Sequence, residues 1–120
     1  MKLKATEKQT QRAVLDYLNY SGYFAWRNNS GFIILGKQKK RVIKIGLVGM
    51  PDILCIKKFK GLPILIGFEI KGEDGELNEN QIIMKKNLEQ YYVKYFVVRS
   101  VDDVVNSLKK YDKELLKLQK

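Results

Sequence analysis

Two apolar segments joined by a short basic connection constrain the fold of this 120-residue chain more than any other feature. The first covers residues 53–56, and the second runs from residue 64 to residue 70. Runs of apolar and β-branched residues bounded by Gly or Pro are typical of strands buried on both faces. We expect the two strands to pair as a hairpin through residues 57–63, with the lysines of this turn, Lys57, Lys58 and Lys60, either solvated or making peripheral contacts.

Charged residues stand at one end of this expected strand pair. Asp52 precedes the first strand, while Glu69 and Lys71 come at the end of the second. Side chains alternate along a strand, so Glu69 and Lys71 share a face, and hairpin pairing brings Asp52 to the same edge. Buried charges are normally paired with each other or bound to a metal ion. Two carboxylates for one ammonium favour a hard divalent cation such as Mg²⁺ over an internal ion pair, which stays the alternative.

Composition points to a polyanionic partner. The 23 Lys and Arg residues outnumber the 13 Asp and Glu residues, so the net charge is +10, and such a surface attracts nucleic acid phosphates. The sequence has no histidine and one cysteine, which excludes imidazole catalysis, an internal disulfide and a zinc–thiolate site. No segment approaches the ~20 apolar residues of a membrane span, and none resembles a signal peptide. We therefore expect no membrane association and a cytoplasmic location.

The remaining elements follow from capping residues and hydrophobic periodicity. Helix-capping side chains predict helices that begin after Thr6, Asn78 and Ser100. The last helix covers residues 101–118, where Val104, Leu108, Tyr111, Leu115 and Leu118 form an apolar stripe that meets a partner subunit beyond Tyr111 or packs on the sheet. Short β-prone segments predict further strands at residues 23–27, 32–35, 41–45 and 95–98. Strands interleaved with helices predict one α/β domain over residues 1–120, with a central mixed sheet flanked by helices.

Four short motifs occur in a specific order along the chain. They are Gly49-x-Pro51-Asp52, then Glu69-Ile70-Lys71-Gly72, then Gly75-x-Leu77 with Gln81, and finally Val98-Arg99-Ser100. In order and spacing this set resembles the VRR-NUC family of virus-type replication and repair nucleases, within the PD-(D/E)xK nuclease superfamily. The resemblance extends from Glu7 to about Val105. It departs from the family at residues 90–93, where Gln-Tyr-Tyr-Val replaces the glycine expected at the turn before the last strand.

The resemblance implies a restriction-endonuclease-like core and a metal-dependent active site. In this family an Mg²⁺ or Mn²⁺ ion would be held by Glu7, Asp52, Glu69 and the backbone carbonyl of Ile70. Asp52, Glu69, Lys71 and Gln81 would be the catalytic residues, with Lys71 either activating the water nucleophile or stabilising negative charge. Two of these residues also have ordinary explanations, because acids favour the first turn of a helix and a glutamine at Gln81 completes a capping box.

The implied activity is hydrolysis of DNA phosphodiester bonds. The resemblance suggests a structure-selective endonuclease that acts as a homodimer on branched DNA, most specifically a Holliday junction resolvase. Alternatives are a nuclease for flaps or nicked duplex and a basic nucleic-acid-binding module without catalysis. Candidate DNA contacts lie on basic loops, where the lysines of residues 37–40 either are merely solvated or grip a DNA backbone; the candidates are Arg27, Asn28, Lys37, Lys39, Lys40, Arg41 and Arg99.

Overall fold

The computed structural model describes residues 5–28 and 31–118, and the secondary structure of this part is an α/β arrangement, as predicted. The helices are α1 (Glu7–Tyr20), α2 (Glu79–Gln90) and α3 (Val101–Lys117). The strands are β1 (Phe24–Arg27), β2 (Gly31–Leu35), β3 (Arg41–Ile45), β4 (Ile53–Phe59), β5 (Leu62–Ile70) and β6 (Lys94–Val98). None of the helices within the described residues has the length and apolar character needed to span a lipid bilayer.

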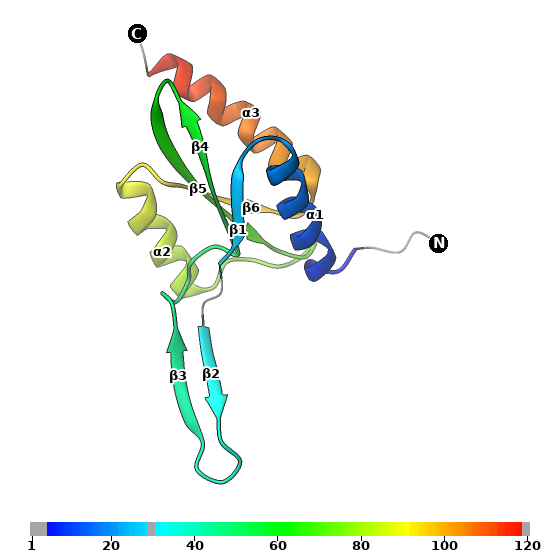
Figure 1. The fold of residues 1–120 in the computed structure, drawn as a ribbon, viewed down its shortest axis with the longest axis vertical. Helices are drawn as coiled ribbons and strands as arrows, with labels where there is room; N and C mark the ends of the chain where they lie inside the picture. Colours follow the sequence, from blue (N-terminus) through cyan, green and yellow to red (C-terminus); the bar gives the residue numbers. More distant parts are fainter. Residues whose placement is uncertain (1–4, 29–30, 119–120) are drawn as a thin grey trace.

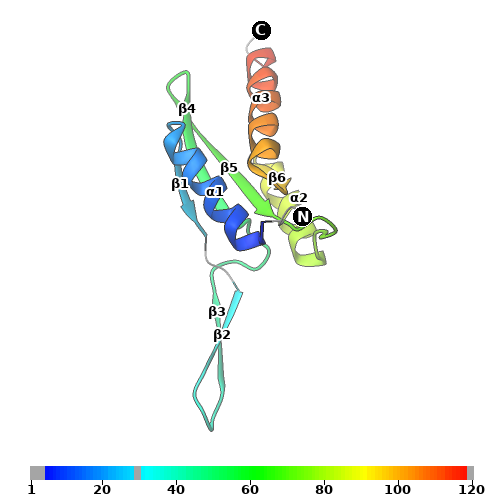
Figure 2. The same cartoon turned by 90° about the vertical axis from the view of Figure 1, so that its right-hand side faces the viewer.

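The central sheet is mixed and has the strand order β1-β4-β5-β6 (Figure 1). Strand β4 pairs antiparallel with β1 and β5, whereas β5 and β6 are parallel. A parallel pair needs a crossover connection, and α2 supplies it. Helices α1 and α3 lie on one side of the sheet and α2 lies on the other (Figures 1 and 2). Strands β2 and β3 form a separate two-stranded sheet that projects from the body.

The main core lies between the sheet and the pair α1 and α3. Val14 and Leu18, four residues apart on α1, are buried against the sheet. From α3 the stripe contributes Val104, Leu108, Tyr111 and Leu115, all buried. The stripe therefore packs within its own chain as far as Leu115. This includes residues beyond Tyr111, where contact with a partner subunit was one expectation. Leu118 does not join it, because the helix ends at Lys117 and the Leu118 side chain is exposed.

The β4–β5 hairpin turns more tightly than the sequence suggested. Phe59 pairs with Leu62, so the turn consists of Lys60 and Gly61 alone. Both have positive φ angles, 49° and 81°, as in the two-residue turns that match the twist of paired strands. The placement of Lys57 in the turn was consequently wrong, because the residue lies within β4, where its ammonium contacts the Asp112 carboxylate of α3.

Local signals at the helix ends were predicted correctly. Thr6 and Asn78 each form a complete capping box, with Gln9 and Gln81 respectively. At the turn before β6, where the sequence lacks the expected glycine, Tyr92 adopts a φ of 66°. Tyr92 thus adopts the left-handed conformation that glycine takes up readily. Strand β6 begins two residues later.

Candidate active site

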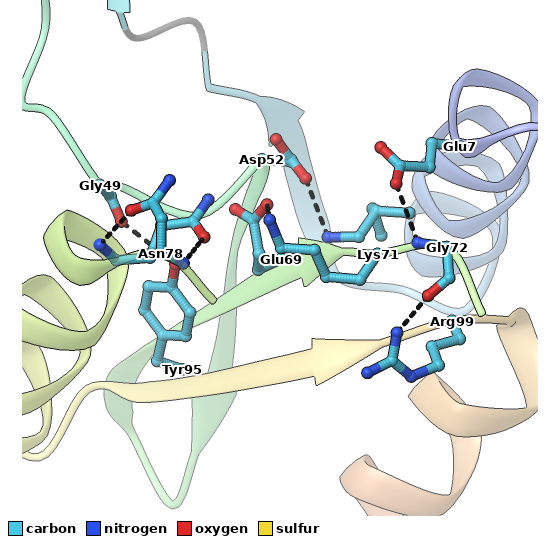
Figure 3. A network of polar contacts seen from close by, with 11 residues as sticks. Glu7, Gly49, Asp52, Glu69, Lys71, Gly72, Asn78, Tyr95 and Arg99 are labelled. Carbon is cyan, nitrogen blue, oxygen red and sulfur yellow. Dashed lines mark hydrogen bonds and ion pairs between the residues drawn. The ribbon is translucent and has the colours of Figure 1, made fainter. Parts of the chain in front are cut away.

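The predicted convergence of Asp52, Glu69 and Lys71 is present at one end of the β4–β5 pair (Figure 3). Ile53 pairs with Phe68 in the antiparallel register, which puts Asp52 and Glu69 at neighbouring positions on the two strands. The Asp52 carboxylate accepts a hydrogen bond from the backbone N–H of Ile70, with Oδ2 and N 2.8 Å apart. This bond ties the beginning of β4 to the end of β5 and fixes the Asp52 side chain beside Glu69.

Glu69 is the buried charged residue of this cluster, with 4% of its surface exposed. Its Oε2 atom lies 3.7 Å from Nζ of Lys71. Its Oε1 atom is buried and has no hydrogen-bond partner within the described part of the chain. Burial, together with the adjacent Asp52 carboxylate, raises the pKa of Glu69 to about 8, and Lys71 acts in the opposite direction. Two acidic side chains and one ammonium therefore lie close together in a poorly solvated place.

Lys71 follows directly after β5, where its backbone N–H donates to the Val98 carbonyl at 3.0 Å and so extends the pairing with β6. Its side chain is largely buried and points along the same face as Glu69 (Figure 3). This is the alternation that the Glu-x-Lys spacing predicts. Lys71 lines a cavity of about 330 Å³ together with Glu7 and Arg99.

A cavity of about 220 Å³ opens in front of the carboxylates, on the side of the sheet that α2 covers. It is lined by Val48, Gly49, Met50, Asp52, Glu69, Asn78, Asn80 and Gln81. Gln81 caps α2, since its Oε1 accepts the Asn78 N–H at 3.0 Å. The same residue lines the cavity, so its capping role and a place beside the site occur together. Helix N-termini also present free N–H groups and a positive dipole, which favour anions such as phosphate.

Close packing brings the loop before β4 to the sheet. Pro51 lies on Gly67 of β5, where a Cβ atom would come within 2.4 Å of the proline Cγ. Gly49 has a φ of 90°, and a Cβ there would lie 2.4 Å from the Asn80 carbonyl oxygen. The two glycines therefore permit the close approach that places Asp52. The sequence signal was a glycine inside the otherwise bulky second strand, which the motif analysis did not use.

Tyr95 is a further residue at the site that sequence reasoning treated only as part of a strand. It is buried on β6, and its hydroxyl donates a hydrogen bond to the Gly49 carbonyl at 3.1 Å (Figure 3). Burial raises its pKa, as do the charges of Glu69 and Asp52, so the hydroxyl stays protonated and a donor. A tyrosine within an aliphatic strand is itself a signal, because a buried hydroxyl needs a partner.

Glu7 reaches the edge of the site from α1. Its Oε1 accepts the backbone N–H of Gly72 at 2.9 Å, one residue beyond Lys71 (Figure 3). Within residues 5–28 and 31–118, no three His, Cys, Asp or Glu side chains gather into a group that could hold a metal. Glu7 thus belongs to the anchoring of the segment after β5, and its role as a metal ligand stays a prediction.

The candidate DNA contacts lie in three different places. Arg99 donates to the Gly72 carbonyl through Nη1, and its backbone N–H donates to Asp103, so it holds the same loop as Glu7. Arg27 is exposed at the end of β1, and the next residue, Asn28, donates its backbone N–H to the Asp52 carbonyl at 2.8 Å. The remaining four are exposed around the tip of the β2–β3 hairpin: Lys37, Lys39, Lys40 and Arg41.

The donor set at the site fits a hard divalent cation. Asp52 and Glu69 offer carboxylate oxygens, one of which is buried and has no partner in the described part of the chain. Mg²⁺ commonly takes one or two carboxylates and completes its shell with water and substrate phosphate. A search against models of known protein families and a search of curated proteins both found no match to the chain.

Proposed function

We propose that this protein is a metal-dependent DNA endonuclease built on a restriction-endonuclease-like core, as its resemblance to the VRR-NUC family suggests. The observation that carries the proposal is the Glu69 carboxylate, which is buried next to Asp52 and, among the residues that the structure describes, keeps one oxygen without a hydrogen-bond partner. An unpartnered buried carboxylate oxygen costs folding free energy, since its hydration is lost and not replaced. A divalent cation is the ligand that would supply the missing partner.

A purely structural ion cluster explains these contacts less well. Lys71 supplies one positive charge at 3.7 Å, which is longer than a direct hydrogen bond, for two neighbouring carboxylates. Structural ion pairs in protein interiors are usually balanced and hydrogen-bonded. The imbalance is the arrangement expected where a bound cation and a substrate phosphate complete the site.

Each residue then has a role in phosphodiester hydrolysis. Asp52 and Glu69 would hold Mg²⁺ or Mn²⁺, with the Ile70 carbonyl as the resemblance implies. The ion, when bound, polarises the phosphate and lowers the pKa of coordinated water. Lys71 would contact the scissile phosphate or the attacking water, where its ammonium stabilises the negative charge that develops. Gln81, at the start of α2, would border the phosphate from the other side of the cavity.

The substrate follows from charge and from the resemblance. A net charge of +10 favours a nucleic acid, and stand-alone nuclease domains of the resembled kind act on branched DNA as twofold dimers. A symmetric dimer presents two equivalent sites, which suits paired incisions in a four-way junction. We therefore propose a Holliday junction resolvase, with flaps and nicked duplex as alternative substrates.

Cleavage assays test the proposal directly. The protein is incubated with a four-way junction, a flap and a linear duplex, with Mg²⁺, Mn²⁺ or EDTA. We expect metal-dependent cutting of branched DNA that Glu69→Ala and Lys71→Ala each abolish. Glu114→Gln is the matched control, because it removes a carboxylate that pairs with Lys94, away from the cavity residues. Cutting that persists in purified Glu69→Ala protein would contradict the assignment.

Metal binding gives a readout that does not depend on cutting. Titration calorimetry with Mn²⁺ should detect binding to the wild type, and Glu69→Ala should lose it while Glu114→Gln retains it. If the protein binds junction DNA but neither binds Mn²⁺ nor cuts, it is the non-catalytic binding module instead. In that case Asp52, Glu69 and Lys71 form a structural cluster.

A further inference from the structure

The β2–β3 hairpin stands apart from the rest of the described molecule. Its two strands pair only with each other and extend away from the body along the longest dimension (Figures 1 and 2). Five residues per strand give the ribbon a length of roughly 17 Å. A two-stranded ribbon without an apolar layer against it is marginally stable in water. The side chains it exposes therefore call for an explanation.

Both faces of this ribbon carry exposed aliphatic side chains. Ile34 and Val42 are cross-strand partners and so share one face, where each is 65% exposed. Leu35 and Ile43 belong to the opposite face by the same register and are 47% and 39% exposed. A ribbon that packed on a single surface would need only one apolar face. Two apolar faces suit insertion between two apolar layers.

The end of the ribbon is strongly basic. All the charged residues from 34 to 43 are cations, and their side chains are exposed; they are Lys37, Lys39, Lys40 and Arg41. Four cations within five residues repel a second copy of themselves and attract phosphates. Charge complementarity thus points to nucleic acid as the partner of the tip.

The base of the ribbon borders the candidate active site. The segment after β3 contributes Val48, Gly49 and Met50 to the cavity that Asp52 and Glu69 also line. On the other side, Asn28, which follows β1, is hydrogen-bonded through its N–H to the Asp52 carbonyl. A nucleic acid strand whose phosphate enters this cavity therefore meets the base of the hairpin beside the site.

We infer that the β2–β3 hairpin is a wedge that recognises a branch point in DNA, an inference that rests on the proposed nuclease function. Its aliphatic faces contact the flat faces of base pairs that a branch leaves unstacked, and its tip holds the flanking phosphates. In continuous duplex the same insertion requires unstacking of a base step, which costs free energy. The hairpin therefore favours branched over linear DNA.

Binding without catalysis tests this inference. Affinities for a four-way junction and for a linear duplex of matched sequence are measured by fluorescence anisotropy in EDTA. We expect the double variant I34T/V42T, which keeps β-branched residues in both strands, to bind the junction about tenfold more weakly and the duplex unchanged. The tip variant K39Q/K40Q should weaken binding to both DNAs. The slope of log affinity against log salt concentration should become shallower by about 2.

Several outcomes would overturn the inference. Unchanged junction affinity in I34T/V42T, or an equal loss on both DNAs, would show that the aliphatic faces do not read a branch. Sedimentation of the same proteins identifies the competing explanation: a dimer that I34T/V42T converts to monomers would make the ribbon an interface between copies. Because binding is measured in EDTA with Asp52 and Glu69 intact, a failed nuclease assay leaves this result interpretable. Unchanged thermal unfolding confirms that the exposed substitutions leave the body folded.

Discussion

Strand β4 carries a charged cluster at each end, and the two clusters differ in balance. At the far end Lys57, with 13% of its side chain exposed, pairs with Asp112 of α3. Its ammonium also lies 5.7 Å and 6.0 Å from the ring centroids of Tyr23 and Tyr111. At the near end, within the described residues, Lys71 pairs with Glu69 alone, Asp52 accepts the Ile70 N–H beside it, and one oxygen of Glu69 lacks a partner.

The difference separates a stabilising cluster from one suited to binding a ligand. One cation facing one anion, with aromatic faces around the cation, recovers much of the cost of burial. Two carboxylates beside one cation leave one carboxylate without a counter-ion, so it either keeps its proton, as the raised pKa of Glu69 indicates, or binds an added cation. Removing a carboxylate should consequently act in opposite directions at the two ends of β4.

The largest effect is expected for Glu69→Gln. We expect cutting to fall at least about a hundredfold, the scale on which removal of a preorganised charge affects catalysis. In EDTA the same variant should unfold at an equal or higher temperature than the wild type, because the amide replaces a buried carboxyl group that is costly to ionise. The measurements are initial cleavage rates and thermal unfolding. A variant that is clearly less stable would mean that Glu69 serves mainly as a structural ion-pair partner.

The second largest effect is expected in the pH dependence of the free energy of unfolding. Burial and the neighbouring Asp52 carboxylate raise the pKa of Glu69 from 4.5 to about 8, so the folded protein holds a proton that the unfolded chain releases near pH 4.5. The contribution of Glu69 to the free energy of unfolding in EDTA should therefore be fully present below pH 4.5 and decline as the pH rises to about 8. Melting temperatures across this range should show the decline in the wild type.

Two controls isolate Glu69 in this experiment. Glu69→Gln has no carboxylate to titrate and should show a smaller decline over the same range. Saturating Mn²⁺ should also reduce the decline, because the ion binds the ionised form and stabilises the fold by mass action. An equal decline in all three samples would assign it to other groups.

A smaller loss is expected for Asp112→Asn at the balanced cluster. The substitution leaves a largely buried ammonium at Lys57 without its counter-ion, which should cost about 1–3 kcal/mol of unfolding free energy. Cutting should be unchanged below the melting transition, since Asp112 lies on α3, across the sheet from the cavity. Denaturant unfolding measures the loss, and adding Lys57→Met should recover part of it by replacing the ion pair with apolar contacts.

The sequence was informative where the signal is local. Alternation placed Glu69 and Lys71 on one face, and three-residue capping patterns located the starts of α1 and α2, because both follow from fixed backbone geometry. Contacts between distant segments were out of reach. Nothing near Lys57 indicates that its partner is Asp112, 55 residues away, and the tight fit of Pro51 on Gly67 depends on the register of two strands.

Tyr95 is the site residue that the sequence did not reveal, and Tyr95→Phe should have the smallest effect. The change keeps the ring and removes the hydroxyl that holds the Gly49 carbonyl, at a cost of about 1 kcal/mol in unfolding free energy. If Tyr95 positions the loop that precedes Asp52, Mn²⁺ should also bind several-fold more weakly and kcat should fall more than KM changes. Tyr111→Phe makes the same substitution on the other side of the sheet and should leave Mn²⁺ affinity unaltered. A loss of stability in Tyr95→Phe with normal Mn²⁺ affinity and normal kcat would limit Tyr95 to packing, because a loop that had loosened around Asp52 could not hold the metal as tightly as before.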